Sequence, residues 1–416
     1  MDAVPASRPR LGFWRVAFCL ILALGIVGTV QRFAGGLGRA THMSDSYPWG
    51  IWKAFNVLAA IGLGGAGFTI MGVAYVLHVE RFRPIVRPTL LMAFLAYLSA
   101  SISLFVDIGR PWAIWHPIVM WNTHSVLFEV AWCLMLYTAV LFLEGSGMLF
   151  ERLGWKRMVR AQHAVTVPIV IAGVVLSTLH QSSLGALFLI VPGKLHPLWY
   201  SADLPLLFFV SAICMGLSMV IVLSRLSARA FRRTLEVPIL TDLSRFLLYG
   251  LCAYGFLRLY ALERGGAFTS LFSLSYETVL FHVEFLLGVV APIAILGSAE
   301  RRRNARRLYA AALLVVMGFV AYRLNVAIVG FEAHQGGHYV PAWSEVAFSL
   351  MIVALAFAAY AFGVQHLDVY PEVTERAGSR PPAASASRRR PPAGGDGAVL
   401  AERRPVAAGP APASRA

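Results

Sequence analysis

Long apolar stretches, separated by short polar segments, occupy most of the sequence. A helix that crosses a lipid bilayer needs about 20 predominantly apolar residues. Ten stretches meet this requirement, at residues 14–31, 55–77, 88–107, 124–143, 163–181, 205–224, 243–262, 276–297, 308–329 and 343–363. The pattern predicts an all-α polytopic integral membrane protein with about ten transmembrane helices.

The polar connections between these stretches differ in charge. Basic residues fill every second connection: Arg81, Arg83 and Arg87 in the second, Arg152, Lys156, Arg157 and Arg160 in the fourth, Arg225, Arg229, Arg232 and Arg233 in the sixth, and Arg301, Arg302, Arg303, Arg306 and Arg307 in the eighth. Cytoplasmic connections of membrane proteins are enriched in Lys and Arg. We therefore expect the even-numbered connections and the N- and C-termini to be cytoplasmic.

The composition supports a membrane protein and limits the classes of partner that the chain is expected to bind. Of the 416 residues, 58% are hydrophobic and 14% are charged, whereas soluble proteins carry about 25% charged residues. A soluble enzyme, a disordered protein and a disulfide-rich secreted module are thereby excluded. Because topology explains the formal charge of +15, we expect contact with membrane lipid and no nucleic-acid partner.

Three regions are expected along the chain. Residues 1–13 form a cytoplasmic N-terminus, 14–363 a ten-helix membrane domain, and 364–416 a disordered, basic, Pro/Ala/Arg-rich cytoplasmic tail. One outer connection, 182–204, is unusual because residues 184–191 within it are apolar. This segment predicts a short helix that lies on the outer leaflet or dips into it.

The cysteines and histidines limit the cofactors that the chain can hold. All four cysteines stand singly in apolar stretches, without CxxC or CxxCH spacing. We therefore expect no metal site, no iron–sulfur cluster and no covalent haem. No predicted span carries two histidines at opposite depths, as a two-haem protein requires. A single b-haem held by His78 and His163 remains an alternative.

Ionisable residues inside the apolar stretches gather toward the predicted outer face. Such residues are energetically costly in a bilayer and mark functional sites by default. The outer set comprises Asp107, His124, Glu129, His180, Arg258, Glu284 and Arg323. The concentration of acids, bases and cations at one depth predicts a site in the outer half of the membrane.

Several of these residues have a structural alternative. Asp107 and Arg110 either pair at the end of a helix or belong to the site. Glu129 shares a helix face with Ser125 and Trp132, which predicts a buried acid that faces a polar stripe.

Glu284 is predicted to be a functional acid or one half of a structural salt bridge. Arg258 and Arg323 are the candidate counter-ions.

Four sequence segments resemble a known family. They are Trp49-Gly-Ile-Trp-Lys53, Gly62-Leu-Gly-Gly-Ala-Gly67, Asp107-Ile-Gly-Arg-Pro111 through Trp121-Asn-Thr-His-Ser125 to Glu129, and Ser177-Thr-Leu-His-Gln-Ser-Ser-Leu-Gly185 through Pro192-Gly-Lys-Leu-His-Pro-Leu-Trp-Tyr200. In this order the chain resembles the NrfD/PsrC family of polysulfide-reductase-type membrane subunits over residues 10–370. Within that family it is most similar to the HybB-like branch, the membrane subunits of Ni/Fe-hydrogenases.

The resemblance implies a multi-pass subunit of the bacterial inner membrane that lacks bound haem and iron–sulfur clusters. Such a subunit reacts with a quinone, menaquinone or ubiquinone, as substrate near the outer face. Its implied partners are a periplasmic ferredoxin-like iron–sulfur subunit and a catalytic subunit, either a hydrogenase or a related oxidoreductase. The resemblance is compatible with proton translocation during turnover.

Residue type and depth suggest roles at the implied quinone site. His180 and His124 are expected to contact the quinone carbonyls, and Asp107 with Arg110 to form a second polar pole. Glu129 and Glu284 are expected to carry protons. Arg258 and Arg323 complete the set as charge partners at the quinone site.

Two other functions remain alternatives. One is a b-haem-containing membrane cytochrome subunit, which the His78 and His163 pair would serve. The other is an ion-coupled secondary transporter, since ten spans with buried charges also suit that class. The outward bias of the polar residues favours the quinone-reacting subunit, because transporters place their sites near the bilayer midplane.

Overall fold

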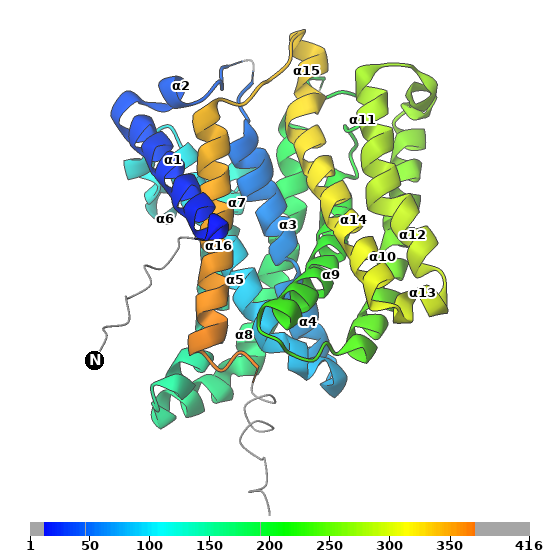
Figure 1. Cartoon of the computed structure of the whole chain (residues 1–416). Coiled ribbons are helices and arrows are strands. Elements are labelled where there is room, and N and C mark those ends of the chain that lie inside the picture. Colours follow the sequence, from blue (N-terminus) through cyan, green and yellow to red (C-terminus); the bar gives the residue numbers. More distant parts are fainter. Residues whose placement is uncertain (1–11, 46, 192, 371–416) are drawn as a thin grey trace, which may run out of the picture. The chain divides into compact units, whose positions relative to one another are not determined.

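The computed structural model describes residues 12–45, 47–191 and 193–370 (Figure 1). Within these residues the chain is helical and contains no strand. Ten helical segments of the described chain are long and apolar enough to cross a membrane, which confirms the predicted all-α polytopic fold. Residues 1–11 of the predicted N-terminal segment and 371–416 of the predicted tail lie outside the described residues. α1 begins at Phe13, within that N-terminal segment, and α16 continues through residues 364–366 of the tail.

The first five spans contain the following elements. They are α1 (Phe13–Gly35); η1 (Trp52–Ala59), α3 (Ala60–Gly64), α4 (Ala66–Met71) and η2 (Gly72–Val76); η3 (Glu80–Phe82) and α5 (Arg83–Asp107); α7 (Val126–Arg152); and α8 (Lys156–Ala186) with η5 (Leu187–Ile190).

The last five spans follow in order. They are α9 (Leu204–Ala230); α10 (Val237–Arg264); α11 (Tyr276–Phe285), η7 (Leu286–Val290) and α12 (Ala291–Leu296); α14 (Ala305–Leu324), η8 (Asn325–Val329) and α15 (Gly330–Gln335); and α16 (Trp343–His366). Short helices in the connections are α2 (Leu37–Ala40), η4 (Pro111–Ala113), α6 (His116–Val119), η6 (Phe268–Phe272) and α13 (Ala299–Arg303).

Consecutive spans run in alternating directions, so the connections gather at two ends of the bundle. The basic connections lie at the end that carries α13, at the bottom of Figure 1, and we call it the basic end. The opposite end carries α2, α6 and α15.

Several helices extend well beyond the apolar stretches that predicted them. α7 runs nine residues past the predicted end at residue 143, and α8 begins seven residues before the predicted start at residue 163. Both extensions lie at the basic end, where polar side chains meet the headgroup region and the apolar signal is lost. α8 also continues beyond residue 181, as far as Ala186.

The prediction of a separate short helix at the outer leaflet is wrong. Residues 184–191 instead continue α8 and pass into the single turn η5. The side chains of Leu187 and Phe188 are buried within the protein. The apolar character of this segment therefore reflects packing against the bundle and not contact with lipid.

The second span and α9 form the most buried part of the bundle. α9 packs against α3, α4, α8, α10 and α14. On one side lie α5, α7 and α8, and on the other α10, α11, α12 and α14, while α1 packs against α16 beside α5. The second span thus contacts α5, α8 and α14, which carry Asp107, His180 and Arg323.

Glycines permit the close contact between the second span and α9. A Cβ atom on Gly216 would lie 2.2 Å from the backbone nitrogen of Ala66, and one on Gly65 would lie 2.8 Å from the carbonyl oxygen of Ala212. Real Cβ atoms do not approach backbone so closely. The glycine run therefore allows helix packing, as in other membrane proteins.

Three spans contain π-helical turns among the described residues: the second span has η1 and η2, the eighth has η7 and the ninth has η8. η1 begins at Trp52, η7 directly follows Phe285, and η8 begins at Asn325. Such turns are frequently found at functional sites because they rotate the side chains that follow them. The indole of Trp52 donates a hydrogen bond of 3.0 Å to the carbonyl oxygen of Glu345, which fixes the start of η1 against α16.

Candidate functional site

Asp107 forms an ion pair at the end opposite the basic end. It is the last residue of α5 and is almost completely buried. Its Oδ2 atom lies 3.1 Å from Nζ of Lys53 in η1, whose side chain remains partly exposed. The expected pairing with Arg110 is wrong, because the chain turns at Ile108 and Arg110 is exposed.

The backbone around Asp107 is held by a third cation. Arg32 of α1 is buried and donates hydrogen bonds of 2.8 Å to the carbonyl of Val106 and 2.7 Å to that of Ile108. These contacts join α1 to the end of α5. They position the carboxylate of Asp107 toward Lys53.

Two neutral polar side chains lie near this ion pair. Asn56 follows Lys53 by three residues in η1, and Ser103 precedes Asp107 by four in α5. Both are buried, and within the described residues neither Asn56 side-chain atom nor the Ser103 hydroxyl has a hydrogen-bond partner. Unpaired polar atoms in an apolar interior are costly, so water or a ligand is expected beside them.

An apolar groove begins at Asn56. It has a volume of about 130 Å³ and is lined by residues of η1, α3, α5, α9 and α16. Asn56 and Ser99 lie toward the end near Asp107, and Tyr360 lies toward the basic end. From Ile352 to Tyr360 along α16 the groove extends about 12 Å, given the helical rise per residue. This length and lining suit a hydrocarbon chain.

His180 lies deeper than the sequence indicated. Its side chain is fully buried, and among the described residues neither ring nitrogen has a hydrogen-bond partner. Because the helical segment continues to Ile190, His180 lies about 15 Å along the axis from that end. Its ring centroid is 5.7 Å from that of Tyr97 in α5.

Further hydroxyl and amide groups surround His180. Gln181 donates hydrogen bonds of 3.0 Å to the carbonyl of Ile61 and 3.3 Å to the phenol of Tyr97. The rings of Tyr97 and Tyr137 pack edge to face at 4.7 Å. These residues place a buried polar cluster between α3, α5, α7 and α8.

Glu129 and His124 lie at the surface opposite the basic end. Glu129 is in the first turn of α7 and accepts a hydrogen bond from the hydroxyl of Ser183 in α8. It is exposed, which contradicts the predicted burial. His124 is also exposed and precedes the helix, whose N-cap is Ser125, so it does not begin the span as predicted.

Glu284 is buried among hydrogen-bond donors in the second half of the bundle. Its carboxylate accepts from Asn325 at 2.6 Å and from the indole of Trp199 at 3.2 Å. Arg258 lies 3.4 Å away as the counter-ion. Of the two counter-ions considered from the sequence, the structure therefore selects Arg258.

Arg323 is buried nearby but has other partners. Its guanidinium donates to the carbonyl of Phe208 at 3.0 Å and to the hydroxyl of Ser211 at 2.9 Å. It also stacks over the Phe208 ring at 3.6 Å. Arg323 thus binds α14 to α9, close to Gly62 of the second span.

The loops opposite the basic end are fixed by buried polar contacts. The backbone nitrogen of His196 donates to the carbonyl of Gly330 at 2.7 Å, and its Nδ1 atom accepts from the backbone of Leu198. Partial burial lowers the pKa of His196, although Glu277 opposes this effect. Burial, followed by the hydrogen bond to Glu345, raises the pKa of Tyr339 far above its usual value.

Sequence reasoning missed several residues of these clusters. Lys53 lies just before the predicted second span, 55–77, so the apolar pattern does not mark its charge as one inside the membrane. Asn56, Tyr97 and Trp199 are uncharged, and the sequence contains no feature that distinguishes a buried uncharged polar residue from an exposed one. Only the tertiary structure shows which residues these three side chains lie beside.

Comparison with known proteins gives a consistent result. Residues 39–333 match the family model described as polysulphide reductase, NrfD. The chain is 31% identical to the probable Ni/Fe-hydrogenase 2 b-type cytochrome subunit of Escherichia coli (strain K12), covering 91% of this chain and 97% of that protein. A protein of Nitratidesulfovibrio vulgaris is 35% identical over 85% of this chain and 93% of its own.

A further relative has a name that states a quinone reaction. The integral membrane subunit of menaquinone reductase from Nitratidesulfovibrio vulgaris is 27% identical, covering 89% of this chain and 94% of that subunit. Together with the ten apolar helices of the described chain, these matches identify a multi-pass inner-membrane protein.

Proposed function

Because the chain belongs to the NrfD family of polysulphide reductase membrane subunits, we propose that it is the quinone-reacting membrane subunit of a respiratory oxidoreductase complex. The observation that carries this proposal is the apolar groove that ends at unpaired polar atoms near a buried ion pair. A quinone has the matching form, with an apolar tail and a head that carries two carbonyl groups.

Lys53, Asp107 and Asn56 are proposed to bind the quinone head. The ammonium group of Lys53 and the amide of Asn56 supply hydrogen-bond donors for a carbonyl oxygen. Asp107 supplies a group that accepts and returns a proton. The isoprenoid tail then occupies the groove between α5, α9 and α16.

His180 and Glu129 are proposed as proton-handling groups of the same half of the bundle. His180 has two free ring nitrogens within the described structure and lies on the helix that carries Ser183, the partner of Glu129. For Glu284, the surrounding donors favour a structural ion pair over proton transfer, and Arg258 and Arg323 are then structural cations. His124 and Arg110 are exposed and are proposed to contact a partner or the membrane surface instead.

Reduction of the quinone needs two electrons and two protons: Q + 2e⁻ + 2H⁺ → QH₂. We propose that a periplasmic ferredoxin-like iron–sulfur subunit supplies or receives the electrons. Its docking surface is proposed on connections 107–123, 182–204 and 330–343, at the end where Asp107 lies. Trp112, Trp115 and Trp121 are exposed on the first of these connections and suit such an interface.

The similarity to a hydrogenase subunit favours a HybB-like Ni/Fe-hydrogenase as the catalytic partner. Mass spectrometry of the complex that co-purifies with the tagged chain tests this assignment. A hydrogenase large subunit together with an iron–sulfur protein is the expected result. A molybdenum-containing reductase would keep the quinone reaction and replace the proposed catalytic partner.

The quinone site is tested in the purified complex with Asp107→Asn and His180→Gln. Each variant is expected to lower quinone reduction about a hundredfold, the usual effect of removing a proton-transfer group. Reduction of a soluble dye by the catalytic partner should be unchanged, because it bypasses the membrane subunit.

Asp242→Asn is the matched control, since Asp242 pairs with Arg81 and Arg245 at the basic end. It should leave both activities unchanged. Unchanged quinone reduction in both test variants would refute the proposed site. An equal loss of quinone reduction in Asp242→Asn would show that the losses in the test variants come from impaired folding.

A bound b-haem is the second candidate, because one relative is named a b-type cytochrome subunit. A reduced-minus-oxidised absorption spectrum of the isolated subunit distinguishes the two. The quinone-only proposal predicts no haem α-band. A stoichiometric band would show that haem carries electrons within the chain.

A further inference from the structure

Two adjoining cavities enter the bundle from the basic end. The outer cavity has a volume of about 460 Å³ and the inner one about 80 Å³. Tyr75, Val86, Arg87, His163 and Thr166 line both of them. The inner cavity reaches Glu144 in α7, so this carboxyl group has a path to the solution at the basic end.

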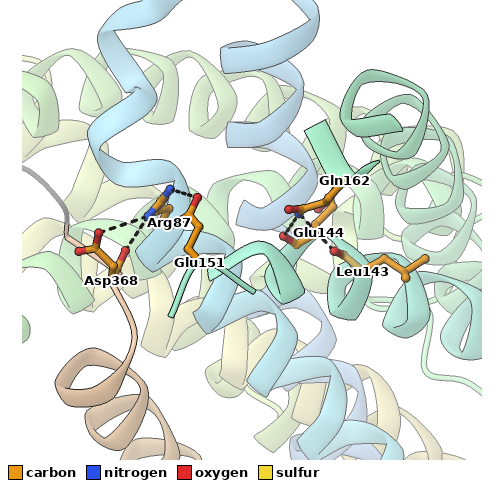
Figure 2. Close-up of polar contacts among 6 residues, drawn as sticks. All are labelled: Arg87, Leu143, Glu144, Glu151, Gln162 and Asp368. Atoms are coloured by element: carbon orange, nitrogen blue, oxygen red, sulfur yellow. Dashed lines mark hydrogen bonds and ion pairs between the residues drawn. The ribbon is translucent and has the colours of Figure 1, made fainter. Parts of the chain in front are cut away.

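Glu144 is buried without a compensating charge. No hydrogen bond or ion pair reaches its carboxylate from any part of the described chain. Gln162 donates to the backbone carbonyls of Leu143 and Glu144, at 3.3 and 2.8 Å, and not to the carboxylate (Figure 2).

The nearest cation is already neutralised. Arg87 donates to Glu151 at 2.8 Å and to the carbonyl oxygen of Asp368 at 2.8 Å, as Figure 2 shows. The other titratable groups around Glu144 are Tyr75 of η2, His163 of α8 and Tyr137 of its own helix. A structural acid would be expected to have partners, as Glu284 does, whereas an unpaired acid within a span marks a functional site.

Beyond Glu144, the absence of a side chain at Gly173 of α8 leaves room for one methyl group between Glu144 and Tyr137. A Cβ atom on Gly173 would lie 3.7 Å from Oε1 of Glu144 and 3.6 Å from Cε2 of Tyr137. Helical side chains lean toward the N-terminus of their helix, and α7 begins at the end opposite the basic one. Glu144 therefore leans toward Tyr137 across the gap that the glycine leaves.

Hydroxyl groups continue from Tyr137 toward His180. Ser177 of α8 is buried near the phenols of both Tyr137 and Tyr97. Within the described residues, neither the Ser177 hydroxyl nor that of Tyr137 has a hydrogen-bond partner, so water is needed to connect them. Tyr97 in turn contacts Gln181 and the His180 ring. A hydroxyl group donates one hydrogen bond while it accepts another, so it passes a proton without remaining ionised.

We propose that Glu144 takes up protons at the basic end for the reduction of the quinone. Tyr137, Ser177 and Tyr97, with water between them, pass the protons toward His180. This inference rests on the proposed function and on the basic end being cytoplasmic. Each quinone then receives two protons by this route and two electrons from the iron–sulfur partner at the opposite end, so that turnover moves charge across the membrane.

The test uses the complete complex in oriented proteoliposomes. Quinone reduction, membrane potential and the pH on each side are followed together. In the wild type, protons should disappear from the side of the basic end as quinol forms. Glu144→Gln should slow quinone reduction about tenfold or more, with partial recovery in Glu144→Asp.

A paired glycine replacement tests the route without removing a charge. Gly173→Ala places a methyl group between Glu144 and Tyr137. The nearest atom to this methyl group would be Cγ1 of Val140, at 3.2 Å. Gly255→Ala is the matched control, because its added methyl group would lie at a similar distance, 3.3 Å, from Cγ1 of Val289 in another part of the bundle. Only Gly173→Ala should slow quinone reduction.

The outcomes separate this inference from the proposed function. Dye reduction and the affinity for a quinone-site inhibitor should stay unchanged in Glu144→Gln. These two unchanged properties would show that the variant is correctly folded. Wild-type proton uptake from the opposite side, or a normal rate in Glu144→Gln, would overturn the route while the quinone reaction stands. A wild-type complex that reduces no quinone would overturn both.

Discussion

At the scale of single residues, the two halves of the bundle treat buried polar groups differently. Around Asn56 and His180, polar atoms of the described structure lack partners. Around Glu284, three donor groups converge on one carboxylate. The first arrangement leaves hydrogen-bonding capacity for a ligand, whereas the acceptors of the Glu284 carboxylate are occupied. Some nitrogens of Arg258 and Arg323 beside it still lack partners within the described residues.

The Glu284 cluster makes a testable prediction about stability. Glu284→Gln and Arg258→Met should each lower the free energy of unfolding by about 3–5 kcal/mol, because each leaves its partner buried without a counter-charge. The double variant should recover most of this loss. Thermal unfolding of the purified complex measures all three.

The same variants decide between the two roles considered for Glu284. Recovery of stability and of quinone reduction in the double variant supports a structural ion pair. A Glu284→Gln protein with normal stability but no quinone reduction would instead make Glu284 a proton carrier.

At the scale of elements, close helix contacts and buried loops position the candidate site. The second span approaches α9 through glycines, and its first turn is held by Trp52 against α16. Small changes in either contact would displace Lys53 and Asn56. The loops at the same end carry the surface on which we propose that a partner docks.

Gly216→Ala is expected to be strongly destabilising. The new Cβ atom would meet backbone of the second span at 2.2 Å, which flexible side chains cannot relieve. Gly145→Ala in α7 is the control, since no atom lies within 4 Å of its added Cβ. It should be neutral or stabilising by up to about 1 kcal/mol through helix propensity. Yield and melting temperature of the two variants test the contact.

His196 should make the loops opposite the basic end sensitive to acid. Its pKa is lowered in the folded protein, whereas an unfolded histidine titrates near 6.5. The unfolded chain therefore binds the proton more readily as the pH falls below about 6.5, and the folded state loses stability. His196→Asn keeps an acceptor for the Leu198 backbone and should show a smaller decrease in melting temperature between about pH 7 and pH 5. Equal decreases in both proteins would contradict this assignment.

At the scale of the whole molecule, charge and polar chemistry occupy opposite ends. The Arg-rich connections lie at the basic end, and Asp107 and Glu129 lie at the other, together with the exposed side chains of Trp112, Trp115 and Trp121. If the basic end is cytoplasmic, the candidate quinone site faces the periplasm.

Cysteine labelling of intact cells tests this orientation. Lys156 is the first residue of α8 at the basic end, Lys194 lies in a connection at the opposite end, and both are exposed. In a background without the native cysteines, a membrane-impermeant thiol reagent should modify Lys194→Cys and leave Lys156→Cys unmodified until the cells are opened. The reverse pattern would invert the proposed topology and place the partner in the cytoplasm.

The span assignment was predictable because the bilayer imposes it locally. A segment of about 20 apolar residues reports its own environment, so all ten spans were found from composition alone. Their ends were less accurate, as α7 and α8 show, because helices continue into the headgroup region where polar residues are tolerated. Depth estimates based on those ends then placed His180 too near the surface.

The candidate site was only partly predictable. Asp107, His180 and Glu284 were found because ionisable groups are conspicuous in apolar stretches. Arg258, the counter-ion of Glu284, was among the predicted partners. Lys53, the partner of Asp107, and the separate acid Glu144 were missed because they lie just outside the ends of the predicted spans.

The amino-acid sequence by itself determined the ten-span helical architecture and the separation of basic from polar connections, since both depend on the transfer of individual segments from water to lipid. Only the tertiary structure decided which buried groups are paired and which are free. That choice depends on helix rotation and close packing, which π-helical turns and glycine contacts set across distant parts of the chain. It separates Glu284, with its full set of donors, from Asn56, His180 and Glu144.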